Sequence, residues 1–249
     1  MKIGLIGIVG DEAKQDFWGT YSRVAEMGCE GVEAVEGTLL EGDAAENVRR
    51  FQAMGLRNLT TSASRDDLRE RLDEVRRRAV ASGASRVSIW WSEANDRGTL
   101  LREAELYESA AASLAEDGLR LCYHNHDQEF RNTFDGMNAL ELLASNTERL
   151  AFTIDIGWAA VGGADPAAVL RSLNGRVPAV HVKDFADLSD RASFTAVGSG
   201  AVPFGPALEA AKEIGTEWAV VEQDKLRNLS AFDTILASIL NLRERGLPG

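Results

Sequence analysis

Cysteine, proline and long apolar runs are all scarce in this sequence. Of the 249 residues, 2 are cysteine and 5 are proline. Cys29 and Cys122 lie in different apolar segments without CxxC spacing, which favours reduced buried thiols over a disulfide. No apolar run approaches the length of a membrane span, and residues 1–8 are too short and too interrupted by glycine for a signal peptide. We therefore expect a cytoplasmic protein with no membrane partner.

Basic residues are also in deficit, with 27 Lys and Arg against 39 Asp and Glu and a formal net charge of -12. This charge repels the phosphates of a nucleic acid, so we expect no nucleic-acid partner. Alternating charge signs over 65–71 indicate an ordinary solvated surface as the simpler explanation of the acidic balance. Hydrophobic residues at 45% and charged residues at 27% exclude a disordered chain.

Segments that would divide the chain are missing as well. No stretch rich in Pro, Gly or Ser interrupts it, so we predict a single domain over 1–249. Gly4, Gly7 and Gly10 have the wrong spacing for a GxGxxG phosphate-binding turn, and no Walker lysine occurs. A doubly wound nucleotide-binding sheet is thereby disfavoured.

What the chain does contain is a regular alternation of two patterns. Short β-rich apolar segments occur at 2–8, 31–36, 56–61, 86–91, 119–124, 151–155, 177–182 and 218–222. Helical spacing occurs between them at 13–27, 43–54, 65–83, 98–117, 136–145, 165–173, 203–214 and 229–245. Asp165 before Pro166 and Ser230 before an apolar pair are typical helix N-caps. Eight such units in one domain predict an α/β fold, a (β/α)8 TIM barrel.

Polar side chains gather where the last four predicted strands end. Catalytic groups of a parallel barrel stand at the C-terminal ends of its strands. His124 and His126 end the fifth strand, and His181 ends the seventh, so all 3 histidines lie in two of these places. Asp155 ends the sixth strand and Glu222 the eighth. Unpaired inward charges on consecutive strands would cost several kcal/mol each, which favours a bound cation over a purely structural cluster.

These residues form a candidate site for one divalent metal ion. His124, Asp155, His181 and Glu222 are the candidate ligands, although the sequence leaves open whether His124 or His126 binds from the fifth strand. Imidazole favours Zn, Co or Fe over Mg, and carboxylate keeps Mn among the alternatives. Such an ion polarises a ketone or hydroxyl oxygen and eases removal of a proton from the adjacent carbon. Glu222 would then be both a ligand and a base.

Three further features of the sequence each allow more than one role or placement. Lys183 next to Asp184 predicts either a structural ion pair or a lysine that reaches substrate oxygens. The glycine-rich segment 197–203 precedes a helix, so its amides contact substrate or phosphate, or it is a flexible connection. Trp90 and Trp91 face opposite ways on a strand, so we expect one ring in the pocket and the other in the core.

Taken in order, these motifs resemble the sugar phosphate isomerase and epimerase family of xylose-isomerase-like barrels. The resemblance spans nearly the whole chain. The matching segments are 28–33, 123–126 with Glu129 and Phe130, 155–158 with Asp165 and Pro166, 181–184, 197–200 and 221–224.

The resemblance implies a divalent-metal-dependent sugar isomerase or epimerase that abstracts a proton next to the carbonyl of a keto sugar or sugar derivative. Asp155, His181 and Glu222 match metal ligands of ketose 3-epimerases, but His124 stands where those enzymes have glutamate. A proton shuttle between two glutamates is therefore not implied. The residues expected to move the proton are Glu222, His126 and Lys183, and those expected to bind substrate are Glu33, Glu129 and Trp158.

The family also contains enzymes of other classes. Inosose dehydratases and enzymes of 3-keto sugars make a lyase that acts by β-elimination the main alternative to an isomerase. Zinc endonucleases for abasic DNA use histidines on earlier strands, whereas no histidine precedes residue 124 here. A metal-free sugar-binding or subunit role is a third hypothesis. The expected partner is a small-molecule sugar, and a homo-oligomer is compatible with each hypothesis.

Overall fold

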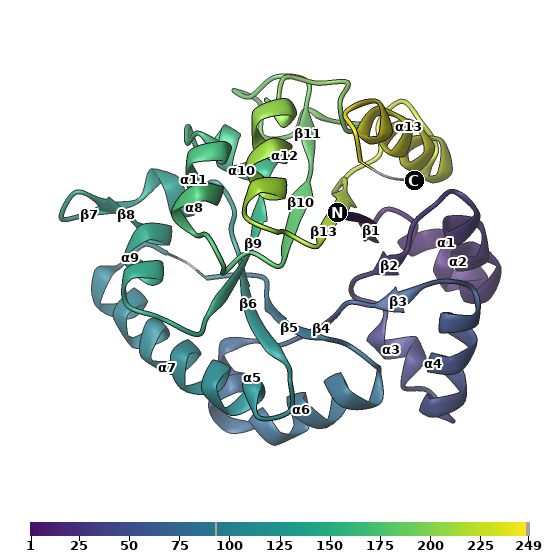
Figure 1. Cartoon of the computed structure of the whole chain (residues 1–249), viewed down its shortest axis with the longest axis horizontal. Helices are drawn as coiled ribbons and strands as arrows, with labels where there is room; N and C mark the ends of the chain where they lie inside the picture. The colour runs from purple at the N-terminus through teal and green to yellow at the C-terminus, as the bar shows by residue number, and fades with distance from the viewer. Residues whose placement is uncertain (93, 248–249) are drawn as a thin grey trace.

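The predicted apolar segments form one parallel sheet that closes on itself. A computed structural model describes residues 1–92 and 94–247, so residues 93, 248 and 249 of the predicted domain lie outside the described part (Figure 1). The strands of the sheet are β1 (Lys2–Ile6), β2 (Gly31–Val32), β3 (Arg57–Asn58), β4 (Thr60–Ser62), β5 (Arg86–Ile89), β6 (Arg120–His124), β9 (Ala151–Asp155), β10 (Ala179–Val182) and β13 (Trp218–Glu222). Their order is β3-β2-β1-β13-β10-β9-β6-β5-β4. The prediction of a TIM barrel is confirmed.

The third predicted strand, 56–61, is where the ring closes. Its two pieces, β3 and β4, lie at opposite ends of the sheet order and are separated by Leu59 alone. The side chains of Asn58 and Thr61 both reach Ser82, at 3.2 and 3.3 Å. Strict alternation would place residues three apart on opposite faces, so an extra residue bulges the strand here. Leu59 packs instead with Ile6 and other residues of a small apolar cluster.

Helices form the outer layer around the strands (Figure 1). They are α1 (Gly10–Gln15), α2 (Phe17–Glu26), α3 (Glu36–Leu39), α4 (Ala44–Ala53), α5 (Arg65–Glu70), α6 (Leu72–Ala81), α7 (Arg97–Ala115), α8 (Gln128–Arg131), α9 (Ala139–Ser145), α10 (Ile156–Val161), α11 (Pro166–Ser172), α12 (Phe204–Glu213) and α13 (Ala231–Glu244). Both predicted N-caps are confirmed, since Asp165 accepts a hydrogen bond from Ala167 N and Ser230 from Asp233 N.

Several predicted boundaries are wrong for identifiable reasons. Helix 13–27 is interrupted at Asp16, whose side chain caps α2, and helix 65–83 is interrupted at Arg71. Strand 31–36 ends at Val32, and Ala34 has a φ of 59° before α3 begins. Helix 136–145 begins only at Ala139, because β7 (Thr133–Phe134) and β8 (Met137–Asn138) form a hairpin there. A second unpredicted hairpin joins β11 (Asp184–Phe185) to β12 (Phe194–Thr195).

The core lies mainly between the strands and the helices. Cys29 and Cys122 are buried and free, as predicted.

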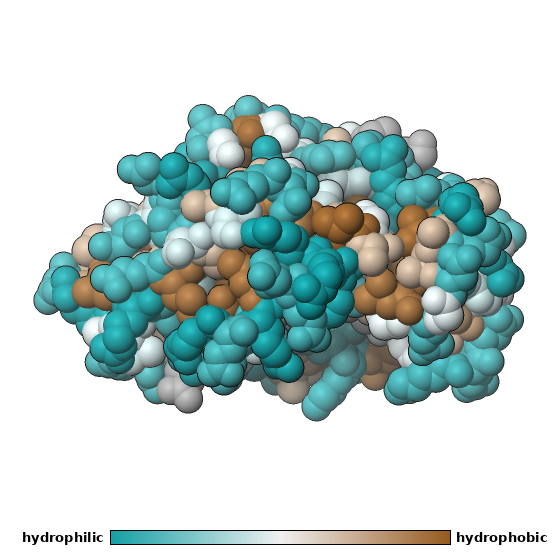
Figure 2. All heavy atoms as spheres, turned by 90° about the horizontal axis from the view of Figure 1, so that it is seen from below, coloured by the Kyte–Doolittle hydropathy of each residue, from teal (hydrophilic) through white to brown (hydrophobic). Residues whose placement is uncertain are grey.

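Hydrophilic side chains cover most of the face seen in Figure 2, with hydrophobic ones exposed between them. Among the helices of the described residues, none combines the length and the apolar content that crossing a bilayer requires.

Candidate functional site

Four predicted ligands meet at the C-terminal end of the barrel. His124, Asp155, His181 and Glu222 each offer one ligand atom, and these atoms all lie within 4.8 Å of one another. Their strands β6, β9, β10 and β13 are consecutive neighbours in the sheet, and the register places His181 beside Asp155. Alternation along each strand turns all four side chains toward the inside. Residues far apart in sequence thus form one buried cluster.

The cluster contains polar atoms that the protein itself does not satisfy. Both ring nitrogens of His124 and Oδ2 of Asp155 are buried, and they make no hydrogen bond within the described residues. The nearest carboxylate oxygens to His124 Nε2 are Asp155 Oδ2 at 3.7 Å and Glu222 Oε2 at 3.9 Å. Buried polar atoms without a partner are costly, and two nitrogen and two oxygen donors suit a divalent cation. The residues present therefore fit the ion that the sequence predicted.

The two carboxylate oxygens of Asp155 have different surroundings. Its Oδ1 accepts a hydrogen bond from Trp158 N at 2.8 Å and caps α10, while Oδ2 faces the cluster. The backbone N–H of Asp155 donates to Asn125 Oδ1 at 2.9 Å, which holds the strand end in place. Asp155 can therefore cap the helix and act as a metal ligand at the same time.

Lys183 lies against the cluster and not against its neighbour in sequence. Its Nζ is 3.1 Å from Glu222 Oε1, 3.4 Å from Asp155 Oδ2 and 3.0 Å from Asp224 Oδ1. Burial by itself lowers the pKa of Lys183, but these carboxylates more than offset burial and raise it. The lysine is therefore a buried ammonium group. The structural ion pair with Asp184 that we considered is not what the structure shows.

Asp184 organises the glycine-rich segment instead. Its carboxylate accepts hydrogen bonds from the backbone N–H groups of Phe185, Gly198 and Gly200, each at 2.8 Å, and of Val202 at 3.2 Å. These amides point toward a buried side chain. The expectation that amides of 197–203 contact substrate or phosphate is therefore wrong for Gly198, Gly200 and Val202, and so is the alternative of a flexible connection.

His126 borders the cluster as a neutral imidazole. Its ring centre is 5.1 Å from that of His124, 5.1 Å from that of Trp91 and 5.8 Å from that of Trp158. Burial, followed by the nearby His124, lowers the pKa of His126 to about 4. Its Nδ1 has no hydrogen-bond partner among the described residues. An unpaired neutral imidazole in this place can accept a proton.

Glu33 and Glu129 differ from what we expected of substrate-binding residues. Each is 1% exposed, with both carboxylate oxygens engaged by protein groups. Glu129 accepts hydrogen bonds from the Tyr123 hydroxyl and from His126 N, both at 2.7 Å. Glu33 lies against His181 and Arg86. Neither carboxylate has a free, accessible oxygen in this structure, and the substrate contacts expected of Glu33 and Glu129 stay predictions.

Aromatic rings surround the mouth of the site. Trp158 lies below Lys183 and Arg191, whose charged groups are 5.0 and 5.4 Å from its ring centre, and its Nε1 has no partner among the described residues. Trp90 lies 5.5 Å from the ring of His124. Trp91 is 56% exposed, whereas Trp90 is partly buried and packs against the small apolar cluster of Ile6 and Leu59, so the prediction of one core tryptophan is confirmed in part.

Other residues of the site were missed by sequence reasoning. Arg86 and Arg191 contact site residues but lie outside the motifs considered. An arginine at the start of an apolar strand, as at Arg86, is a signal that a buried partner exists. Arg191 lies in the unpredicted β11–β12 hairpin and carries no such signal. Asp224 lies two residues beyond Glu222, within the matched segment 221–224, and alternation predicts it on the same side, but no role was assigned to it.

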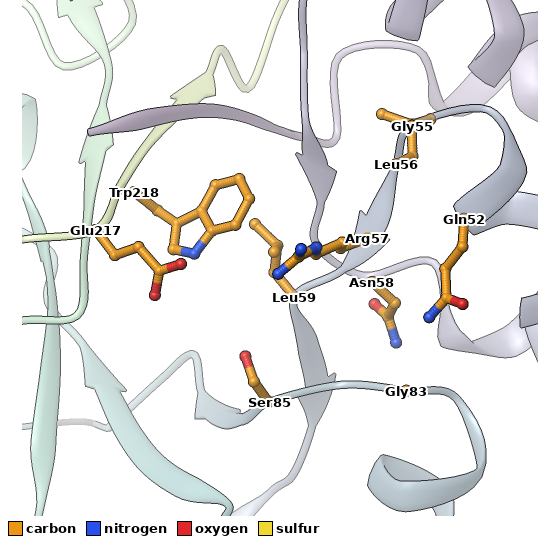
Figure 3. Close-up of a pocket in the computed structure, with 10 residues that line it drawn as sticks. All are labelled: Gln52, Gly55, Leu56, Arg57, Asn58, Leu59, Gly83, Ser85, Glu217 and Trp218. Carbon is orange, nitrogen blue, oxygen red and sulfur yellow. The ribbon is translucent and has the colours of Figure 1, made fainter.

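Two cavities lie at opposite ends of the barrel. One of about 600 Å³ lies where β4 and β5 end and is lined by Trp90 and Trp91, of which Trp90 is 5.5 Å from the ring of His124. The other, of about 670 Å³, lies where strands begin and is lined by residues such as Arg57, Glu217 and Trp218 (Figure 3). Glu217 pairs with Lys2 at 3.0 Å, and none of the four candidate ligands is among the described residues that line either cavity. Catalytic groups collect at the C-terminal end of barrel strands, so the cluster marks the functional end.

Comparisons with known proteins agree with this geometry. An inosose dehydratase from Klebsiella pneumoniae is 27% identical over 141 residues, which are 50% of this chain and 47% of that protein. The chain thus spans about half the length of the curated relatives it matches. Among solved structures, a sugar phosphate isomerase/epimerase from Parabacteroides distasonis has a TM-score of 0.80 at 22% identity and covers 97% of this chain and 93% of its own.

A protein called IolI, solved with a bound zinc atom, has a TM-score of 0.76 at 15% identity, with 98% of both chains covered. At these identities the solved structures establish the fold alone. A family model described as xylose isomerase-like TIM barrel matches residues 21–244. The match extends over most of the sequence, and the chain therefore belongs to the xylose isomerase-like TIM barrel family.

Proposed function

We propose that this protein is a divalent-metal-dependent enzyme that removes a proton next to the carbonyl of a keto sugar or cyclic keto-polyol. The observation that carries the proposal is the buried cluster of His124, Asp155, His181 and Glu222, whose unsatisfied atoms lie beside Lys183. A divalent ion bound there would polarise the substrate carbonyl. The remaining tasks belong to side chains of the protein.

Glu222 is the best placed proton acceptor. His181 Nδ1 lies 2.7 Å from its Oε2, and Lys183 lies 3.1 Å from its Oε1. Burial alone would raise the pKa of Glu222, but Lys183 and His181 hold it well below its usual range. The carboxylate is thus ionised and oriented at neutral pH. His126, neutral and at the edge of the cluster, is the second candidate base.

The arrangement favours elimination over epimerisation. Epimerisation by two opposed carboxylates needs a second glutamate, but the fifth strand supplies His124, and Glu129 is fully engaged elsewhere. Elimination needs one base and one acid. The base takes the proton, the C–H electron pair forms a C=C bond, and the β-hydroxyl leaves with a proton as water. Lys183, an ammonium group 3.1 Å from the base, is the proposed acid.

The inosose dehydratase relative supports the same choice, since an inosose is a cyclic polyol with one ketone and a dehydratase removes water. We therefore propose a dehydratase of cyclic keto-polyols. Isomerisation of a keto sugar shares the first step and differs in where the proton returns.

The test uses metal-stripped protein, to which Zn²⁺, Mn²⁺, Co²⁺ or Mg²⁺ is added singly, with inososes and keto sugars in D₂O. Proton NMR should show deuterium uptake next to the carbonyl together with an unsaturated product. Uptake with an isomeric product and no loss of water would make the enzyme an isomerase. If no metal binds and no substrate exchanges, the proposal fails.

A further inference from the structure

A chain of three buried side chains runs across the barrel interior to the cluster. Arg86 on β5 donates from Nη2 to Glu33 Oε1 at 2.5 Å, and Glu33 Oε2 lies 3.0 Å from His181 Nε2 on β10. The three residues are 2%, 1% and 0% exposed. Their strands are not neighbours in the sheet, so the contacts cross the inside of the barrel.

The chemistry of these groups determines where the imidazole proton sits. An ionised carboxylate only accepts hydrogen bonds, so the His181 nitrogen that faces Glu33 carries its proton. Arg86 is permanently charged and keeps Glu33 ionised. His181 Nε2 is thereby used, and the other nitrogen, Nδ1, faces Glu222 at 2.7 Å inside the cluster. Because Glu222 is also a carboxylate, the metal-free His181 carries a proton on Nδ1 as well. A bound ion replaces the Nδ1 proton, whereas the Nε2 proton stays hydrogen-bonded to Glu33, so the Nδ1 lone pair then points to the ligand site.

We propose that Glu33 and Arg86 are positioning residues that hold His181 with Nε2 protonated and present Nδ1 to the bound ion. The inference rests on the proposed metal-dependent function. Carboxylates behind ligating histidines set the tautomer and ring orientation, and their loss typically weakens metal binding by 10- to 100-fold. Glu33, expected from the sequence to bind substrate, acts through His181 instead.

The chain offers a control for a buried carboxylate with a structural role, Glu103, although its arginine partner is exposed. Arg65 and Glu103 lie 2.6 Å apart, and the Glu103 side chain is 3% exposed. Glu103 bonds to Ser92 and Arg65, not to a member of the cluster. Glu103→Gln therefore removes a comparable buried charge without touching a ligand.

The experiment compares Glu33→Gln and the double variant Glu33→Leu/Arg86→Met with Glu103→Gln and the unmodified protein. The double variant removes both charges together, which guards against misfolding from a lone buried arginine. Zn²⁺ dissociation constants are measured on metal-free protein whose folding is checked by thermal melting. Both Glu33 variants should bind Zn²⁺ roughly 10- to 100-fold more weakly, and Glu103→Gln should stay within about 2-fold. A folded Glu33 variant with unchanged affinity overturns the proposal.

Histidine NMR provides a second reading, which is simple because the chain has 3 histidines. With Zn²⁺ bound, ¹⁵N shifts should show His181 protonated at Nε2 and ligating through Nδ1, and this pattern should be lost in the Glu33 variants. Ligation through Nε2 overturns the proposal. If the unmodified protein binds no Zn²⁺, the proposed function fails separately. In that case the metal-free protein still tests the contact between Glu33 and His181. A slowly exchanging His181 Nε2 proton that is present in Glu103→Gln and absent in both Glu33 variants supports the contact. If this proton is also present in the Glu33 variants, the proposal is overturned.

Discussion

At the scale of single residues, Asp155 couples the metal site to a helix end. Asp155→Ala removes a charged ligand and also the cap of α10, so we expect Zn²⁺ binding to be lost. The loss of an N-cap alone costs about 1 kcal/mol. Asp165→Ala is the matched control, because Asp165 caps α11 and lies outside the cluster. Metal analysis should show occupancy in Asp165→Ala only. Full occupancy in Asp155→Ala would remove Asp155 from the site.

A substitution at Glu222 should reduce proton transfer more than metal binding. Glu222→Gln keeps the side-chain shape and one oxygen donor, so we expect part of the ion to be retained. Loss of the proton acceptor should lower the rate of solvent deuterium exchange by roughly 100-fold or more. The control is Asp224→Asn, which lies on the same strand face and contacts Lys183. If Glu222→Gln holds its ion and exchanges at the unmodified rate, His126 becomes the first candidate base.

Lys183 should contribute to folding as well as to turnover, because its ammonium group lies among three carboxylates. Lys183→Met keeps much of the apolar stem but leaves those carboxylates unpaired. Removing one partner of a buried ion pair costs about 3–5 kcal/mol, so unfolding of the metal-free variant in urea should show a loss of this size. An unchanged free energy of unfolding would mean that the lysine is dispensable for folding and serves substrate alone.

At the scale of elements, α10 depends on a glycine where it approaches β10. A Cβ on Gly157 would clash with the Lys183 carbonyl oxygen, so Gly157→Ala must push α10 away from the strand. We expect a loss of about 1–3 kcal/mol in stability, together with weaker Zn²⁺ binding, because Asp155 and Trp158 flank this glycine. Gly205→Ala on α12 is the control, since nothing lies within 4 Å of its added Cβ. Equal melting temperatures for the two variants would contradict the prediction.

For the whole molecule, the ion should stabilise the barrel, since its ligands come together only in the folded state. At a Zn²⁺ concentration of 100 times the dissociation constant, the gain is about 2.7 kcal/mol. For a chain of this size we expect a rise in melting temperature of roughly 5–10 °C by scanning calorimetry. Asp155→Ala should show no such rise. The same rise in that variant would place the stabilising ion at another site.

The repeated strand and helix units could be predicted from the sequence, because apolar periodicity and helix caps are local properties. Parallel strands of a barrel end together, so the strand-end residues also predicted that Asp155, His181 and Glu222 meet a histidine of the fifth strand, without choosing between His124 and His126. Boundaries failed where a side chain changed the local hydrogen bonding, as Asp16 does, or where a hairpin replaced the start of a helix at 133–138.

The partner of each polar group could not be predicted in this way and depends on the folded barrel. Lys183 forms ion pairs with Glu222 and Asp224 and not with adjacent Asp184, because alternation turns neighbouring side chains to opposite faces. Glu33 reaches His181 across 148 positions of sequence, a contact that no local pattern encodes. Strand periodicity tells which side chains point inward, whereas closure of the barrel determines which of them are close enough to bond.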